Sequence, residues 1–435
     1  MTFRTLLRQA ALFLAAWAAG VGAVFLGKQV THFNAAHYWP LSIFKPRWPA
    51  PAHWLGFAAA AALFTIALRF ELWRRGRFAV VGGGSLIVLA SALGQGWEGG
   101  YARPIAGLSD GIGVQYYHAA IELSGPGEAL HDFNAIQPRL RNHAATHPPG
   151  ALLLFWALAR LLTAPALIGL ALALGSLLLG GWLLHGFLGR FLDAERAALG
   201  TWLFFLLPAV QIYAVASLDA LIAGCFLGCL RCFEPERAWP RLLAAFAWLL
   251  VAAWLTFAFL YLLPVLAWVE LRSRRTLWRS ALLALAAGLA LTALRPLVGF
   301  DYWQAGISAA RLDNREGWLL LADPLSYVST RVEDVAEILL FLGPFAIALA
   351  WQGWRARRGE WREWTRGGLL SLAGALLAGA YKTGETARGC LFILPLLLLP
   401  ILAAPAIARE RPARLLSVLL FAQALAMQAF GDYFW

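Results

Sequence analysis

The sequence predicts an all-α protein, a polytopic bundle of membrane helices. Of its 435 residues 60% are hydrophobic and only 14% are charged, a balance too apolar for a water-soluble globule. The apolar runs are about as long as a helix needs to cross ~30 Å of hydrocarbon, and none alternates as a membrane barrel strand does. We therefore expect about thirteen transmembrane helices, with interfacial helices in a large first extracytoplasmic loop.

The expected spans follow one another along the whole chain. The first, Thr5 to Leu26, has the charged start of a signal peptide but a longer apolar stretch, and is read as a retained anchor. Ala151 to Leu162 is too short to cross and is expected to lie at the interface. Little polar turn separates 241–257 from 258–270, so whether these are two crossings stays open. The remaining spans are expected near 54–70, 78–96, 165–189, 198–214, 218–233, 241–257, 258–270, 278–297, 335–352, 367–381, 390–407 and 413–430.

Charge sets the orientation. The chain has a formal net charge of +12, and 23 of its 36 Lys and Arg residues fall in loops on the side of the N-terminus. Cytoplasmic loops carry such an excess, so this side is predicted to be cytoplasmic in a plasma (inner) membrane protein. A positive inner face explains the basic composition without nucleic acid as a partner.

Three regions follow from this topology. Residues 1–77 form an N-terminal pair of spans, and 78–300 form a membrane core that includes the outer loop 97–150. Residues 301–435 form the C-terminal helices, with a second outer loop over 301–334 and a candidate phosphate site over 382–388. The loop 97–150 is the longest polar interval, and because irregular backbone cannot face lipid, it must lie at a membrane surface or line a cavity.

Asp110 is the first candidate catalytic residue in that loop. It stands between Ser109 and Gly111, ahead of a helical pattern, where it can cap a helix. It can equally present a carboxylate at the outer mouth of a membrane cavity, as a general base for an incoming hydroxyl. The two interpretations are compatible.

Asp219 and His147 are the other candidate catalytic residues. Asp219 lies where two short spans meet outside, and an acid there needs a polar neighbour or water, so it is expected to face the same cavity as Asp110 or else to cap the turn. His147 precedes Pro148 and Pro149, which hold it extended ahead of a helix start with its ring projecting. A helix start alone explains the prolines but does not require the histidine.

A late cluster is the candidate site for a donor phosphate. Lys382 and Arg388 lie just before an apolar span, beside the backbone N–H groups of a helix N-terminus. Cations are misplaced there for the helix dipole, which favours anion binding over a structural role. Glu385 is expected to orient Arg388 by pairing with it.

The remaining polar residues carry weaker signals. Glu98, Tyr101, Tyr117 and His118 are further candidates for lining the cavity. Outer-loop residues including Asp301 and Arg311 fit either a solvated face or the rim of an acceptor site. Cys225, Cys229 and Cys232 share one apolar segment without a His or carboxylate, which favours packing over a metal site. Signatures of nucleotide and zincin sites are absent from the sequence; no cofactor is assigned, and a divalent metal is left open.

The order of these features resembles the GT-C membrane glycosyltransferases, in particular protein O-mannosyltransferases and lipid A aminoarabinose transferases. The features are an acid followed by tyrosines and a helix (Asp110 to Leu123), a Pro-Pro helix start (His147-Pro148-Pro149) and an Asp-Ala-Leu at the next outer turn (Asp219-Ala220-Leu221). The resemblance covers roughly residues 78 to 300, and the block Gly384 to Arg388 is similar to one found in bacterial members. Gly111 and His147 depart from the common Glu and Lys of those families.

The resemblance implies a function. Asp110 would correspond to the catalytic base and Asp219 to the second outer acid, and the sugar donor would be a polyprenyl-phosphate sugar. The acceptor would be a hydroxyl of a glycan, lipid or protein at the extracytoplasmic face of the bilayer. Asp110 would activate that hydroxyl while Arg388 and Lys382 neutralise the departing phosphate, and a single displacement would invert the anomeric centre.

Two other functions fit the same composition. A non-enzymatic lipid or solute transporter would also have an apolar bundle and a polar outer cavity, and it predicts inverted repeats and spans broken at mid-membrane. A ligase or polymerase of surface polysaccharide would need a larger outer cavity with more basic residues.

Overall fold

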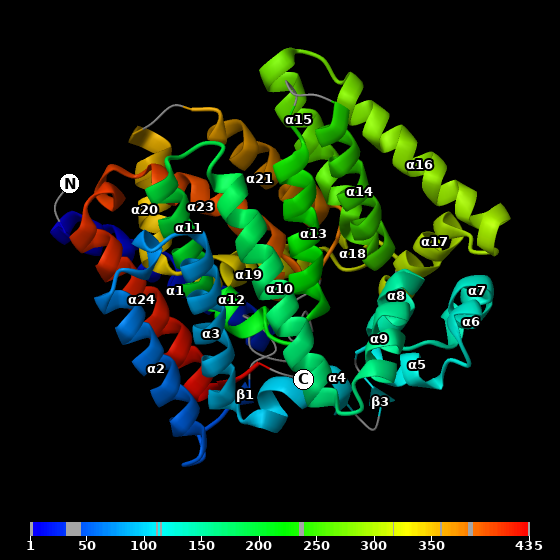
Figure 1. The fold of residues 1–435 in the computed structure, drawn as a ribbon, viewed down its shortest axis with the longest axis horizontal. Coiled ribbons are helices and arrows are strands. Elements are labelled where there is room, and N and C mark those ends of the chain that lie inside the picture. The colour runs from blue at the N-terminus through cyan, green and yellow to red at the C-terminus, as the bar shows by residue number, and fades with distance from the viewer. Residues whose placement is uncertain are drawn as a thin grey trace.

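The computed structural model describes residues 3–31, 45–109, 112–113, 115–234, 239–315, 317–356, 359–381 and 386–433. This part of the chain is almost entirely helical (Figure 1). Two antiparallel pairs of two-residue strands are present, β1 (Lys45–Pro46) with β4 (Gly431–Asp432) and β2 (Leu108–Ser109) with β3 (Ile112–Gly113). The predicted all-α class is confirmed.

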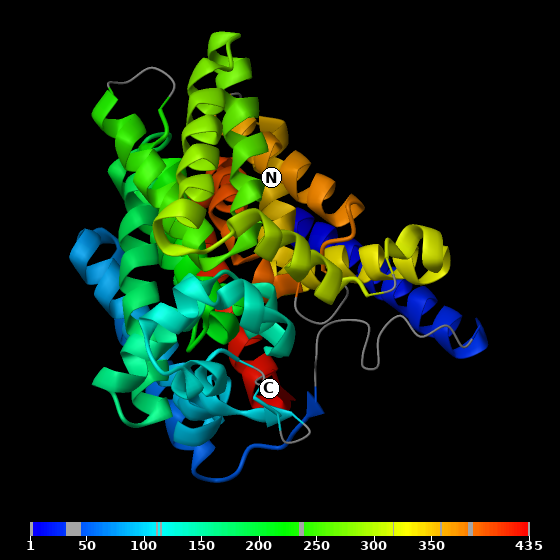
Figure 2. The same ribbon diagram turned by 90° about the vertical axis from the view of Figure 1, so that its right-hand side faces the viewer.

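The N-terminal helix α1 (Phe3–Thr31) runs along the outside of the bundle (Figure 2). It contacts α19 (Pro324–Leu342) and α20 (Pro344–Ala356), and the Trp17 indole N–H donates to the carbonyl of Ala336. Only 6% of the most apolar stretch of this helix is buried within the protein. An apolar helix with so little protein contact suits a lipid environment.

The centre of the bundle is built from closely packed helices. The Phe205 ring of α11 packs against Gly84 of α3 and Gly181 of α10. A Cβ added at Gly84 would lie 2.2 Å from this ring, and one added at Gly181 would lie 2.5 Å from it. Small residues let apolar helices approach in this way. The central helices are α2 (His53–Arg69), α3 (Arg77–Ala92), α10 (Pro165–Leu188), α11 (Ala194–Leu206), α12 (Pro208–Tyr213), α13 (Leu218–Cys232) and α24 (Glu410–Phe430), with the short 3-10 helices η1 (Leu72–Arg74) and η2 (Leu93–Gln95).

The second half of the chain adds longer and shorter helices around this centre. Thr256 breaks the apolar stretch over 241–270, and its hydroxyl accepts from the Ala258 N–H to begin a 3-10 turn. The two segments are therefore separate helices. The elements are α14 (Trp239–Leu255), η5 (Phe257–Tyr261), α15 (Leu262–Arg274), α16 (Trp278–Val298), α17 (Tyr302–Asp313), α18 (Leu319–Ala322), α19, α20, α21 (Trp361–Leu377), α22 (Thr386–Gly389), η6 (Leu391–Ile393), α23 (Leu394–Ala403) and η7 (Pro405–Ala408).

Length and composition support a membrane protein. Five described helices are long and apolar enough to cross a bilayer, and a sixth crossing is counted if the bent pair α19–α20 forms one span. Shorter apolar helices of 10–17 residues cover other predicted segments. The count of thirteen spans stays a prediction.

One predicted span is wrong as a continuous helix. The segment 335–352 is divided at Gly343, where α19 and α20 meet at 94°. Gly343 has a φ of +94°, a conformation that favours glycine, and Pro344 begins the next helix. The second outer loop expected over 301–334 is also largely helical, and Glu333 and Asp334 on α19 are buried.

The outer loop 97–150 folds into short elements beside α17 (Figure 1). The helix expected to lie at the interface is present and begins at Pro149. The elements are the π-helix η3 (Glu98–Ala102), α4 (Arg103–Ala106), the β2–β3 hairpin, α5 (Tyr117–Glu122), α6 (Pro126–His131), α7 (Phe133–Ile136), η4 (Gln137–Arg139), α8 (Asn142–Thr146) and α9 (Pro149–Leu161).

Ion pairs connect loops that the sequence assigned to the cytoplasmic side. Arg74 contacts Glu195 at 3.2 Å, and Arg414 pairs with Glu71. Arg103 pairs with Asp432 at 2.8 Å, and this contact joins two segments that the sequence assigned to the outer side. Each pair joins segments that the sequence assigned to one side, and the orientation of the chain in a membrane stays a prediction.

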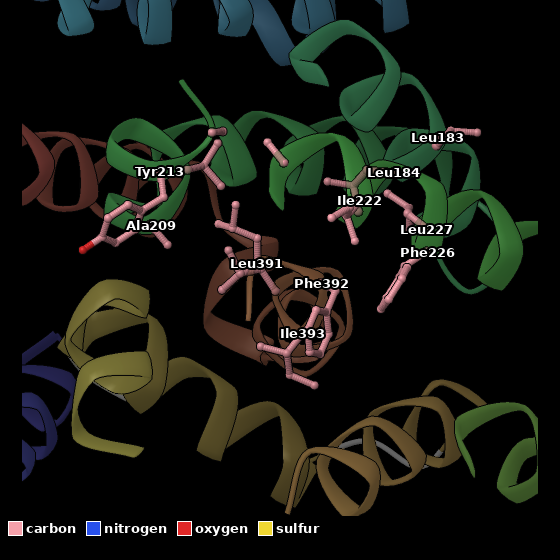
Figure 3. Close-up of a cluster of buried hydrophobic side chains, with 14 of the residues drawn as sticks. Leu183, Leu184, Ala209, Tyr213, Ile222, Phe226, Leu227, Leu391, Phe392 and Ile393 are labelled. Atoms are coloured by element: carbon pink, nitrogen blue, oxygen red, sulfur yellow. The ribbon is translucent and has the colours of Figure 1, made fainter. Parts of the chain in front are cut away.

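A buried apolar cluster positions the segment around Arg388. Figure 3 shows η6 at its centre, with Phe226 and Ile222 of α13 on one side and Tyr213 of α12 on another. The rings of Phe392 and Phe226 lie 5.4 Å apart. This packing fixes the chain immediately after α22 against α12 and α13, which carry neighbouring parts of the candidate site.

Candidate functional site

Asp219 is placed by the start of α13. Ser217 is the N-cap, and its hydroxyl accepts from the Asp219 N–H at 3.1 Å. Asp219 therefore occupies the first turn, where the helix dipole favours a negative charge. Its carboxylate points away from the helix towards α22.

Arg388 meets this carboxylate. Its Nε lies 3.1 Å from Asp219 Oδ2, and its side chain is only 12% exposed. A guanidinium can only donate, so its contact with the ring of His143, 3.2 Å from Nη2 to Nε2, identifies that ring nitrogen as the acceptor. Arg388 thus connects the C-terminal part of the chain to both α13 and the outer loop.

The short helix α22 is held in place by α19. The Thr386 hydroxyl donates to Asp334, and the Ala387 N–H donates to Glu337 Oε1 at 3.0 Å. Asp334 also pairs with Arg331 at 2.9 Å. The buried acids of α19 therefore fix the backbone that carries Arg388.

His147 has the conformation that the following proline predicts. Its φ and ψ are −119° and 156°, fully extended, and α9 begins two residues later. Its Nδ1 lies 3.1 Å from the carbonyl oxygen of His143. A carbonyl can only accept, so Nδ1 carries the proton, and in a neutral ring Nε2 keeps its lone pair.

Burial favours the neutral form of both histidines. It is the main cause lowering the pKa of His147; Asp219 and the His143 carbonyl oppose this shift, and Arg388 adds to it. Burial and the adjacent Arg388 lower the pKa of His143 well below its usual range. A neutral His147 with an unprotonated Nε2 is chemically suited to accept a proton.

His143 and Tyr116 belong to this group although the sequence did not single them out. The Tyr116 ring lies 5.3 Å from that of His147 and 6.2 Å from that of His143. It also packs 5.2 Å from Phe155 of α9. The spacing of the two histidines, one helical turn apart, was the available signal.

A small cavity of about 30 Å³ adjoins Arg388. Gln115, Ser217, Tyr213 and Tyr433 are among its lining residues. A volume of this size accommodates a water molecule or two. A sugar phosphate is larger, so its binding at Arg388 requires the lining segments to move.

The other predicted cavity residues take different positions. The Tyr101 hydroxyl donates to the Leu89 carbonyl at 2.7 Å, inside the bundle, and the His118 ring lies 3.0 Å from the Ala106 carbonyl oxygen. Tyr117 packs against His118, and Glu98 is exposed. In the part of the chain that the structure describes, no contact joins any of these four to Arg388.

Three candidate residues fall outside the described residues: Asp110, Lys382 and Glu385. Among the described residues, no group of three or more His, Cys, Asp or Glu side chains is placed to hold a metal ion. The candidate site is therefore built from Asp219, His143, His147 and Arg388. No protein-family model, curated protein or solved structure matches the chain.

Proposed function

We propose that this chain is a membrane glycosyltransferase of the GT-C type with about thirteen spans. It would take a sugar from a polyprenyl-phosphate donor and transfer it to an acceptor hydroxyl of a glycan, lipid or protein at the outer face of the plasma membrane. The N-terminus would be cytoplasmic. The observation that supports this proposal best is the meeting of Asp219, His143 and Arg388, which come from three distant parts of the sequence.

The proposed reaction is a single displacement. The acceptor oxygen attacks the anomeric carbon as the bond from that carbon to the phosphate oxygen breaks, and the acceptor proton passes to a base. Asp110 is the proposed base. Asp219 already pairs with Arg388, so its proposed role is to orient the guanidinium.

Arg388 and Lys382 are the proposed partners of the departing phosphate. Glu385 is proposed to orient Arg388 by pairing with it. A guanidinium binds phosphate oxygens through its fork of N–H donors. Its Nε and Nη2 contact Asp219 and His143. A phosphate bound at Arg388 would therefore have to share the guanidinium with these partners or displace one of them.

A test of the proposed base compares Asp110→Asn with Asp132→Asn in purified full-length protein supplied with a polyprenyl-phosphate sugar. Asp132 is an exposed acid in the same outer loop and serves as the matched control. We expect the first variant to lose transfer while keeping donor affinity, and the second to retain both. Unchanged turnover in Asp110→Asn would exclude this residue as the base.

The break between α19 and α20 favours one alternative. Transporters use discontinuous helices, and the 94° bend at Gly343 follows a helix that carries buried acids. Reconstitution into liposomes separates the two functions, because a transporter moves lipid or solute between the leaflets or compartments without altering it. Release of the sugar from its lipid phosphate supports transfer, and movement of an intact substrate supports transport.

A further inference from the structure

A groove of about 540 Å³ lies between the C-terminal half of α16 and α17. Figure 1 shows α16 leaning away from the bundle and α17 turning back beneath it towards α8. Thr292 and Arg295 line the groove from α16, and Trp303, Ile307 and Arg311 line it from α17. It is far larger than the cavity at Arg388, and none of its lining residues forms that cavity.

The charges in the groove leave a net positive rim. Arg295 Nη1 lies 3.1 Å from Asp301 Oδ2, and the other oxygen of Asp301 accepts from the Gln304 N–H at the start of α17. Arg311 lines the groove without a hydrogen bond or ion pair to any residue that the structure describes. The positive charge of Arg311 would therefore match the negative charge of one bound anionic group.

The surroundings of the groove are apolar. Only 17% of the most apolar stretch of α16 is buried within the protein. Leu289 and Leu297 of this helix are 63% and 75% exposed. Ile307, which lines the groove from α17, is 55% exposed. The Trp303 indole N–H donates to the Thr292 hydroxyl at 2.9 Å, so its polar atom is satisfied while 42% of the residue stays exposed.

We propose that this groove binds the phosphate of a bilayer phospholipid. Arg311 and the outer face of Arg295 contact the phosphate, and the acyl chains lie along the exposed leucines of α16. The proposal does not depend on the glycosyltransferase assignment, because it uses none of the residues around Arg388. A bilayer lipid fits better than a soluble anion because the charged rim adjoins an apolar helix surface.

Occupancy of the groove would brace α17 against the outer loop. The Gln137 side-chain amide donates to Ala305 of α17 at 3.0 Å and to Ala145 of α8 at 2.9 Å. Asp313, at the far end of α17, acts electrostatically on His147. The groove therefore lies along a helix whose C-terminal end, just beyond Arg311, acts on the candidate site.

Native mass spectrometry of the full-length protein in detergent tests the proposal. Phosphatidylglycerol, phosphatidylethanolamine and diacylglycerol with the same acyl chains would be titrated separately. We expect both phospholipids to be retained and diacylglycerol to be lost, with inorganic phosphate at millimolar concentration failing to compete. Equal retention of diacylglycerol, or displacement by inorganic phosphate, would overturn the proposal.

Variants locate the lipid. Arg311→Ala should weaken retention at least about fivefold, since one basic group near a lipid surface contributes about that factor. Ile307→Asp, a substitution at an exposed position that adds a negative charge to the groove, should also weaken retention of the phospholipid. Arg315→Ala removes an exposed arginine one turn further on and should leave binding unchanged. Wild-type retention in both groove variants refutes the site, and displacement of the phospholipid by stoichiometric polyprenyl phosphate would assign the groove to that lipid instead.

Discussion

Arg388 Nε lies 3.1 Å from Asp219 Oδ2, and both side chains are largely withdrawn from solvent. The pair joins α22, near the C-terminus, to the first turn of α13. A carboxylate held in this way is a poor candidate for an open base, because the guanidinium already occupies one of its oxygens. The geometry instead gives Asp219 the task of aiming Arg388.

The first prediction concerns the coupling between these two residues. A double-mutant cycle with Asp219→Asn and Arg388→Gln should give a coupling free energy of about 1–3 kcal/mol, because each single change leaves the other charge without its partner. Thermal denaturation of the purified protein measures it. Changes in stability that simply add would mean that the pair does not form.

The second prediction concerns the donor. Arg388→Gln should lower the affinity for a polyprenyl-phosphate sugar by about tenfold or more, and Arg388→Lys should recover only part of it, because lysine cannot present a planar fork. Equilibrium binding to the lipid donor provides the measurement. Arg141→Gln, an exposed change in the adjacent outer loop, is the control. Equal affinities for all four proteins would remove Arg388 from the phosphate site.

Local patterns predicted much of this architecture. The apolar runs gave the class and most helix positions, and the proline at 148 gave the extended backbone of His147. The placement of Asp219 beside the break between two helices, α12 and α13, came from the short apolar segments around it. These features depend on residues close together in the chain.

The long-range features were not predictable in the same way. The only local signal for His143 was its spacing of one helical turn from His147, and its contact with an arginine from α22 could not be read from that spacing. The bend at Gly343 was missed because apolar residues continue on both sides of it. Glu333 and Asp334 fell within the outer loop expected over 301–334, whereas the fold buries both, with Asp334 against Arg331 and α22.

The third prediction concerns pH. The pKa values of His143 and His147 are lowered in the folded protein from an ordinary value of 6.5, chiefly by burial. The unfolded chain therefore takes up protons at these two rings first, and the stability that they contribute should be full above about pH 6.5 and fall as the pH drops below it. Melting temperatures measured from pH 7.5 to 5 should show this decline.

His143→Gln separates the contribution of this ring. The amide can still accept from Arg388 but does not titrate, so the decline in melting temperature below about pH 6.5 should become shallower. An unchanged slope in His143→Gln would show that this ring is not held neutral by the fold.

The fourth prediction concerns Gly150, which sets the distance between α9 and α14. A Cβ at this position would lie 2.1 Å from the Trp254 carbonyl oxygen, and a backbone atom cannot yield as a flexible side chain does. Gly150→Ala should therefore destabilise the protein by about 1–3 kcal/mol and displace the helix start that holds His147, lowering transfer as well. Gly175→Ala on α10 is the matched control: nothing lies within 4 Å of its Cβ, and alanine is the better helix former, so stability and transfer should be equal to or above those of the wild type. Comparable losses in the two variants would show that the effect is general to apolar helices and is not caused by the contact with Trp254.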